Sequence, residues 1–91
     1  MKPRTLPHVR SELVRLFLEL EDQRPGIGHR LLNELNRALE QVETDALFYP
    51  LVEDQPSGGA FREAHLLRST YRLIFEIRTA EVVVVDRKSV V

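Results

Sequence analysis

The basic side chains in the last third of the chain are the residues best suited to chemistry. Residues 60–91 carry six basic and four acidic side chains, a net charge of +2, whereas residues 1–59 carry seven and ten, a net charge of −3. An arginine presents a rigid fork of N–H donors that matches phosphate and carboxylate groups. The pattern therefore predicts binding of a nucleic-acid backbone or an acidic protein surface, with five target-binding candidates: Arg62, Arg68, Arg72, Arg87 and Lys88. The alternative is that these are ordinary solvated residues on the exposed side of a sheet.

Other kinds of chemistry find little support in the sequence. The histidines are far apart and none has a partner at metal-ligand spacing, which argues against a metal site at His8, His29 or His65. Three hydroxyl residues lie in predicted turns: Ser57, Ser69 and Thr70. None has a histidine at a spacing that predicts an activated nucleophile. Gly58 and Gly59 neither follow a strand nor open a helix with a lysine, as a phosphate loop requires. Hence no metal, nucleotide or flavin cofactor is implied.

Two amphipathic helices are predicted ahead of the basic region. Apolar residues recur at steps of three and four from Leu6 to about Gln23, and again from Ile27 to about Glu43. Pro25 and Gly26 form a strong stop between the two patterns. Because the connection is so short, the helices should form an antiparallel hairpin over about residues 6–43.

The pattern changes to a period of two after a loop rich in turn formers at residues 50–60. Three strands are predicted, at residues 61–67, 71–78 and 82–85. The run from Val82 to Val85 is apolar on both faces, which favours a central or doubly covered strand over an exposed edge. The expected fold is α+β, with the helical hairpin packed on a three- to four-stranded antiparallel sheet over about residues 61–86.

Size and composition set the limits of this fold. A chain of 91 residues supports one domain with one modest core. It has no cysteine, so it has no disulfide framework, and the reducing cytoplasm is the expected location. No apolar run has the length of a signal peptide core or a membrane span, so no membrane partner is expected.

The order of these elements and the local sequence resemble the RelE/ParE superfamily of toxins from bacterial type II toxin–antitoxin systems. Residues 61–68 look like the family's arginine strand, and Glu81 to Val85 looks like its valine-rich strand. Tyr71-Arg72-Leu73-Ile74-Phe75 is the most telling match. The family's first strand would correspond to a remnant at Lys2 to Leu6.

The resemblance implies two activities. RelE-like members resemble ribosome-dependent messenger-RNA endonucleases, in which the arginine of the Tyr-Arg pair stabilises the cleaved phosphate; the catalytic residues would then be Arg72 with Arg68 or Arg87. The family's terminal tyrosine is absent, because the chain ends in Asp86-Arg87-Lys88-Ser89-Val90-Val91. ParE-like members resemble inhibitors of DNA gyrase that act by binding.

A ParE-like toxin is the leading hypothesis, with a cognate antitoxin as partner and plasmid stabilisation as the associated role. The antitoxin would dock near the helical hairpin or at the sheet edge beside the short first strand. The alternatives are the RelE-like endonuclease and a degenerate, non-toxic interaction module. The valine-rich strand and a short edge also raise the question of a homodimer.

Overall fold

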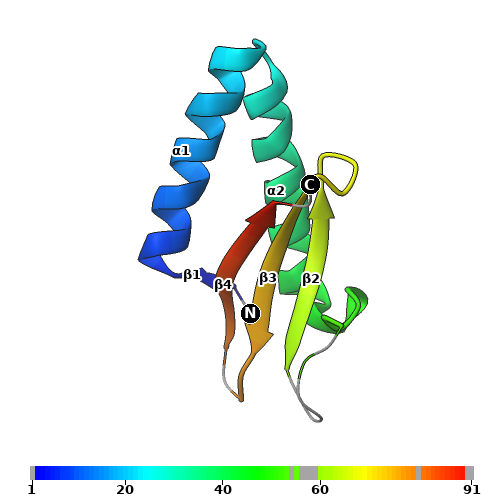
Figure 1. The fold of residues 1–91 in the computed structure, drawn as a ribbon. Helices are drawn as coiled ribbons and strands as arrows, with labels where there is room; N and C mark the ends of the chain where they lie inside the picture. The colour runs from blue at the N-terminus through cyan, green and yellow to red at the C-terminus, as the bar shows by residue number, and fades with distance from the viewer. Residues whose placement is uncertain (1, 54, 56–59, 80, 90–91) are drawn as a thin grey trace.

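The computed structural model describes residues 2–53, 55, 60–79 and 81–89, and it confirms the α+β fold. A helical hairpin covers one face of a four-stranded sheet (Figure 1). In chain order the elements are β1 (Arg4–Thr5), α1 (Pro7–Gln23), α2 (Ile27–Thr44), a 3₁₀ turn η1 (Ala46–Phe48), β2 (Phe61–Leu66), β3 (Tyr71–Ile77) and β4 (Val82–Ser89).

The helical hairpin forms as its hydrophobic periodicity predicts. Val9 and Leu31 are fully buried, one from each helix, and each belongs to a buried stripe that continues along its helix. Pro7 occupies the first turn of α1, where a missing backbone N–H has no cost. The buried stripes face the sheet and each other, so the hairpin and the sheet share a single core.

The turn between the helices is tightened by Glu21 of α1. Its carboxylate accepts hydrogen bonds from the backbone N–H groups of Gly26 (2.9 Å) and Gly28 (2.7 Å), which would otherwise be orphan donors at the start of α2. Gly26 adopts a left-handed conformation with φ of 96°. Gly28 is buried where α2 packs tightly against α1, since an added Cβ would lie 2.7 Å from the carbonyl oxygen of Phe17. The helices therefore meet through glycine.

The strand order in the sheet is β1-β4-β3-β2. Neighbouring strands from β2 to β4 are antiparallel, whereas β1 runs parallel to β4. A parallel pair needs a long crossover connection, and here the whole chain between β1 and β4 supplies it. The remnant expected at Lys2 to Leu6 is thus a real but short strand, continued by the hydrogen bond from the Leu6 N–H to the Val84 carbonyl (3.1 Å). The valine-rich strand is central, as predicted.

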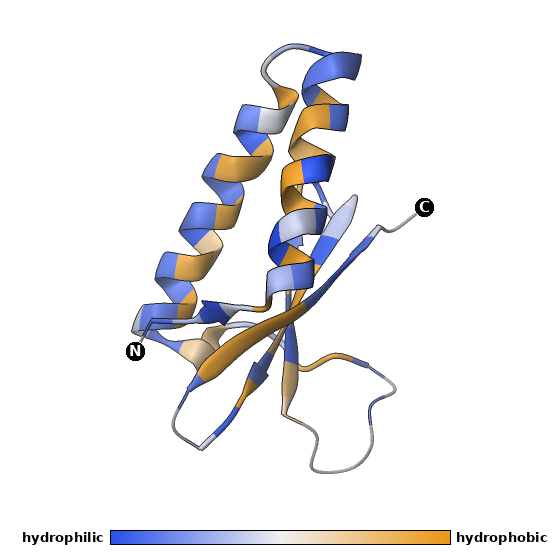
Figure 2. Ribbon diagram, turned by 90° about the vertical axis from the view of Figure 1, so that its left-hand side faces the viewer, coloured by the Kyte–Doolittle hydropathy of each residue, from blue (hydrophilic) through white to orange (hydrophobic). Residues whose placement is uncertain are grey.

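Strand β4 is longer than its apolar pattern predicts. It continues to Ser89, whereas the sequence pattern ended at Val85. The register shifts between Ile74 and Phe75 of β3, which pair with Asp86 and Val84, so Val85 is the extra residue of a β-bulge. The first half of β4 is apolar and the second half is hydrophilic (Figure 2). The apolar pattern therefore did not predict the second half as a strand.

The sheet has a covered face and an open face. Side chains on the covered face pack under the helices; Leu73 and Phe75 of β3 are fully buried there. The open face, away from the helices, carries the alternate residues of β2, β3 and β4. Because the bulge reverses the alternation in β4, Lys88 lies opposite Arg72 on the open face, while Arg87 lies opposite Leu73 on the covered face.

Candidate functional site

The open face of the sheet holds a polar cluster centred on Arg72. Its Nη1 lies 3.4 Å from Glu63 Oε2, across the β2–β3 pair. The other carboxylate oxygen of Glu63, Oε1, lies 3.2 Å from His65 Nε2. Glu63 is only 8% exposed, and it is held between a guanidinium and an imidazole. Pairing of β2 with β3 places His65 directly opposite Arg72, so the three side chains are fixed by strand register.

Ser69 extends this cluster from the β2–β3 turn. Its Oγ lies 2.9 Å from His65 Nδ1. The turn is unusual because three successive residues without glycine have positive φ: Leu67 (48°), Arg68 (55°) and Ser69 (69°). The sequence-based argument that no histidine partners Ser69 is therefore wrong, because the tight turn folds the hydroxyl back onto the strand that precedes it. We call Glu63, His65, Ser69 and Arg72 the open-face cluster.

The open-face cluster combines groups that can move a proton with groups that can stabilise negative charge. An imidazole oriented by a carboxylate is the arrangement of a general acid or base. Arg72 Nε is buried and has no hydrogen-bond partner within the described part of the chain, so this guanidinium has unused donor capacity. Lys88 occupies the neighbouring position on β4. A bound phosphate or carboxylate here would meet two cations and an imidazole.

The predicted target-binding residues do not all converge on this cluster. Arg72 and Lys88 share the open face. Arg62 instead donates to the backbone carbonyls of Tyr49 (2.6 Å) and Leu47 (3.4 Å), and so fixes the segment that follows η1.

The remaining two predicted arginines lie apart from one another. Arg87, on the covered face, approaches Glu12 of α1, with 3.8 Å between its Nε and the carboxylate. Arg68 projects from the strained turn and lines grooves beside α2. The sequence could reveal the charge of these residues, but their direction depends on the bulge and the turn.

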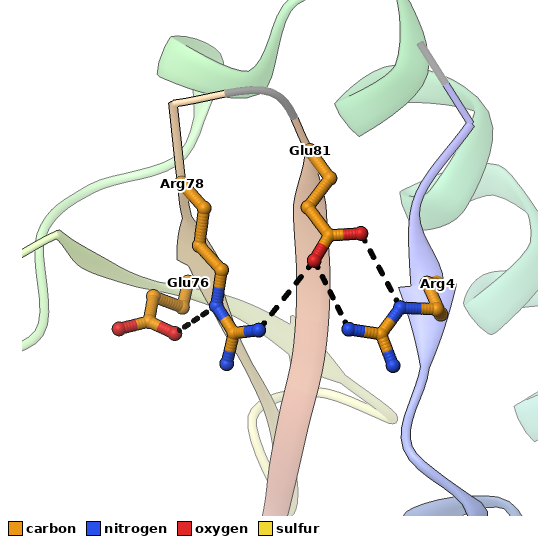
Figure 3. A network of polar contacts seen from close by, with 4 residues as sticks. All are labelled: Arg4, Glu76, Arg78 and Glu81. Carbon is orange, nitrogen blue, oxygen red and sulfur yellow. Dashed lines mark hydrogen bonds and ion pairs between the residues drawn. The ribbon is translucent and has the colours of Figure 1, made fainter.

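The opposite end of the open face is closed by ion pairs (Figure 3). Arg4 of β1 donates to Glu81 (3.0 Å), and Arg78 contacts both Glu81 (3.5 Å) and Glu76 (2.6 Å). The hydrogen bond from Arg4 lowers the pKa of Glu81, and the same bond raises the pKa of Arg4. The charges at this end are matched, and Val83, in register with Arg4 and Glu76, is fully buried. On the described open face, the cationic groups left without a bonded partner, Lys88 and the Nε of Arg72, therefore lie at the Arg72 end.

A second candidate surface lies on the helical hairpin. A groove of about 320 Å³ is lined mainly by apolar side chains, and we call it the apolar groove: Leu13, Val14, Phe17, Leu32 and Leu35, with Thr5 and Arg10 at its border. Val14 is 56% exposed although it is apolar. Thr5 belongs to β1, so the groove reaches the edge strand of the sheet. Within the described strands β1 has β4 as its one neighbour.

Neither metal ligands nor a membrane span is found in the described residues. No group of three or more histidine, aspartate or glutamate side chains there is placed to hold a metal ion. Among the helices described, none is long and apolar enough to cross a membrane.

A comparison with solved structures places the fold among known ones. One chain of the chromosomal ParDE toxin–antitoxin system from P. aeruginosa has a TM-score of 0.79 to this chain. This chain shares the fold of that ParDE chain. The match covers 100% of this chain and 97% of the other at 12% sequence identity, so it is a likeness of fold. No family model matches the sequence, and no curated protein does. The RelE/ParE resemblance is confirmed at the level of the fold.

Proposed function

We propose that this protein is the toxin component of a toxin–antitoxin module, that it acts like ParE by binding an essential target such as DNA gyrase, and that a cognate antitoxin neutralises it. The observation that carries the proposal is the likeness of fold, over the full length, to a chain of a ParDE system. Inhibition by binding requires a stable binding surface and does not require catalytic residues. The Arg72 end of the open face, where Lys88 lies beside the unbonded Nε of Arg72, is the surface that suits an acidic or nucleic-acid-bound target.

The antitoxin is proposed to dock in the apolar groove. An amphipathic segment would bury Val14 and Phe17, and an extended segment could pair with the free edge of β1 next to Thr5. Val14 is the exposed anchor, so Val14→Asp should weaken the complex with the product of an adjoining small reading frame by at least about tenfold, because a charge would be desolvated. Leu47→Asp is the matched control, since Leu47 is 65% exposed on η1 and lies outside the groove.

The target is tested with purified components. Gyrase supercoiling of relaxed plasmid is expected to fall as this protein is added, and to recover when the antitoxin is added. The double variant Arg72→Gln with Lys88→Gln should inhibit less well, whereas Arg15→Gln with Lys2→Gln removes the same charge from other surfaces and should inhibit fully. Undiminished supercoiling at saturating concentrations of the folded protein would exclude gyrase as the target.

A RelE-like messenger-RNA endonuclease is the second candidate, and the open-face cluster favours it. Glu63 and His65 supply acid–base groups beside Arg72. Primer extension on ribosome-bound message distinguishes the two activities. Cleavage that His65→Gln abolishes, while thermal stability is preserved, would support the endonuclease; absence of cleavage would oppose it.

The third candidate is a non-toxic interaction module with the same fold. It would leave both assays negative while still binding the antitoxin through the apolar groove. A homodimer formed through the β1 edge would compete with the antitoxin for that edge. Light scattering measures the molar mass of the protein in solution, and a monomeric mass at all accessible concentrations would exclude the homodimer.

A further inference from the structure

Two adjoining grooves between the helical hairpin and the β2–β3 turn form a second cationic surface, separate from the open-face cluster. The first groove has a volume of about 510 Å³ and the second about 440 Å³. Both are lined by Arg30 of α2 and by Arg68 of the turn. Arg24 adds a third guanidinium to the first groove and Arg37 a third to the second. We call this surface the arginine grooves.

Most of this positive charge is not neutralised. Arg24, Arg37 and Arg68 are exposed, and within the described part of the chain their side chains form no ion pair or hydrogen bond. Glu34 is the acidic residue in the lining of the second groove, and both of its carboxylate oxygens accept hydrogen bonds. One accepts from Arg30 Nε (3.2 Å) and the other from the backbone N–H of Leu67 (2.9 Å). An anion in the grooves would therefore meet several free guanidinium groups.

Glu34 also explains how the surface is positioned. The hydrogen bond from the Leu67 N–H to the Glu34 carboxylate ties α2 to the strained turn. The next residue in the chain is Arg68, whose backbone is left-handed with φ of 55°. Strained residues of this kind persist where surrounding contacts hold them, and they often serve a function. Arg30 and Arg37 are two turns apart on α2, about 10.5 Å along the axis, so they lie on one side of the helix. The chain thus presents a row of cations on α2 opposite Arg68.

The two grooves differ in character, and this difference selects the ligand. The first includes apolar and aromatic side chains, with Ile27, Leu67 and Tyr71 in its lining. The second is lined entirely by polar and charged residues, which include Asn33 and Arg37. A nucleotide chain has this same division, because its bases stack on aromatic and apolar groups while its phosphates are bound by arginine and amide donors. An acidic peptide would need an aromatic side chain next to its carboxylates to match both grooves, whereas every nucleotide carries a base beside its phosphate.

We propose that the arginine grooves bind the phosphate backbone of a single-stranded nucleic acid, with a base placed against Tyr71. RNA and DNA strands share this chemistry. The inference does not rest on the proposed function, since a chain that leaves gyrase and growth unaffected would bind such a strand equally well.

The test is the fluorescence anisotropy of labelled twenty-nucleotide strands, one of oligo(dT) and one of oligo(U), titrated with the wild-type protein at several salt concentrations. Four phosphate contacts predict a slope of log K against log salt of about −3. The variant Arg37→Gln with Arg68→Gln should reduce the slope by about half and weaken binding by about tenfold or more. The oligonucleotide that binds with the higher affinity shows whether the ligand is DNA or RNA.

A charge-matched control separates the grooves from the rest of the surface. Lys2→Gln with Arg15→Gln removes the same two charges elsewhere and should retain the wild-type affinity and slope. If the groove variant is unstable in thermal melts, Arg24→Gln with Arg37→Gln, both exposed helical-hairpin positions, replaces it. Equal losses in the groove variant and the control, or no binding by the wild type, would overturn the proposal. So would tighter binding of a labelled twenty-residue polyglutamate through the same arginines, which would assign the grooves to an acidic protein segment.

Discussion

Replacement of Gly28 by alanine sets two physical effects against each other. Alanine is favoured over glycine inside a helix by about 1 kcal/mol, so helix propensity alone predicts that the variant is more stable. The structure predicts the opposite. The new Cβ would lie 2.7 Å from the Phe17 carbonyl oxygen and 2.7 Å from Glu21 Cγ. The Glu21 side chain can move, but the Phe17 carbonyl belongs to the backbone of α1, so the helices must separate.

The expected cost follows from the contacts that this separation weakens. Overpacking in a well-packed interior costs about 1–3 kcal/mol. Weakening the 2.7 Å hydrogen bond from the Gly28 N–H to the Glu21 carboxylate removes up to about 1.5–3 kcal/mol more. After the gain in propensity of about 1 kcal/mol, the free energy of unfolding should fall by about 1.5–5 kcal/mol. Each kcal/mol lost lowers the Tm by about 4–8 °C for a domain of this size.

Urea unfolding and thermal melts followed by circular dichroism measure this loss. Gly26→Ala is the control, because a Cβ at Gly26 has nothing within 4 Å and meets only the unfavourable φ of 96°. It should cost about 1 kcal/mol. If Gly28→Ala is as stable as the wild type or more stable, the close approach of the helices is refuted. If Gly26→Ala lowers the free energy of unfolding more than Gly28→Ala does, the close contact at Gly28 is not the larger effect, which also contradicts the prediction.

Three further predictions concern polar groups outside the hairpin turn. Arg4→Gln should raise the pKa of Glu81, because the hydrogen bond from Arg4 lowers it. The stability that this pair adds is present above the unfolded pKa of the carboxyl group and is lost as pH falls through its folded pKa. An NMR titration of the Glu81 carboxyl carbon measures the pKa in both proteins. Burial raises the pKa of Tyr49 above its ordinary value of 10.0, so the folded state should lose stability as pH rises from that value toward the folded pKa. Tyr49→Phe should remove this loss in urea unfolding while it keeps the ring contact with Phe75. Arg62→Met should lower the free energy of unfolding by about 1–3 kcal/mol, because the Tyr49 carbonyl loses its donor, yet leave oligonucleotide affinity unchanged; lost affinity without lost stability would contradict this structural role.

The parts of the fold that depend on hydrophobic period could be predicted from the sequence. The helical hairpin was expected at residues 6–43 and the helices span 7–23 and 27–44, because stripes such as Val9 and Leu31 carry a strong signal. The central position of Val82 to Val85 followed from the same reasoning. The second half of β4 was missed, since its residues are polar and its pairing with β3 is set by a bulge at Val85 that no composition reveals.

The candidate site was only partly predictable because side-chain direction depends on long-range geometry. Arg72 alternates with the buried Leu73 along the strand expected at residues 71–78, and this alternation puts Arg72 on the face away from the core. The contact between His65 and Ser69 depends on three residues in the left-handed region, a turn that lacks the usual glycine signal. Whether Arg87 lies on the open or the covered face changes with a single bulged residue.

Growth on induction tests the central claim, that this protein is a toxin, most directly. The chain is expressed from a tightly controlled promoter without an antitoxin, and viable counts are compared with those of an empty vector and of the Arg72→Gln, Lys88→Gln variant. Viable counts are expected to fall by orders of magnitude for the wild type and by less for the variant, and co-expression of the antitoxin should restore growth. Normal growth of cells that contain soluble, folded wild-type protein would contradict it.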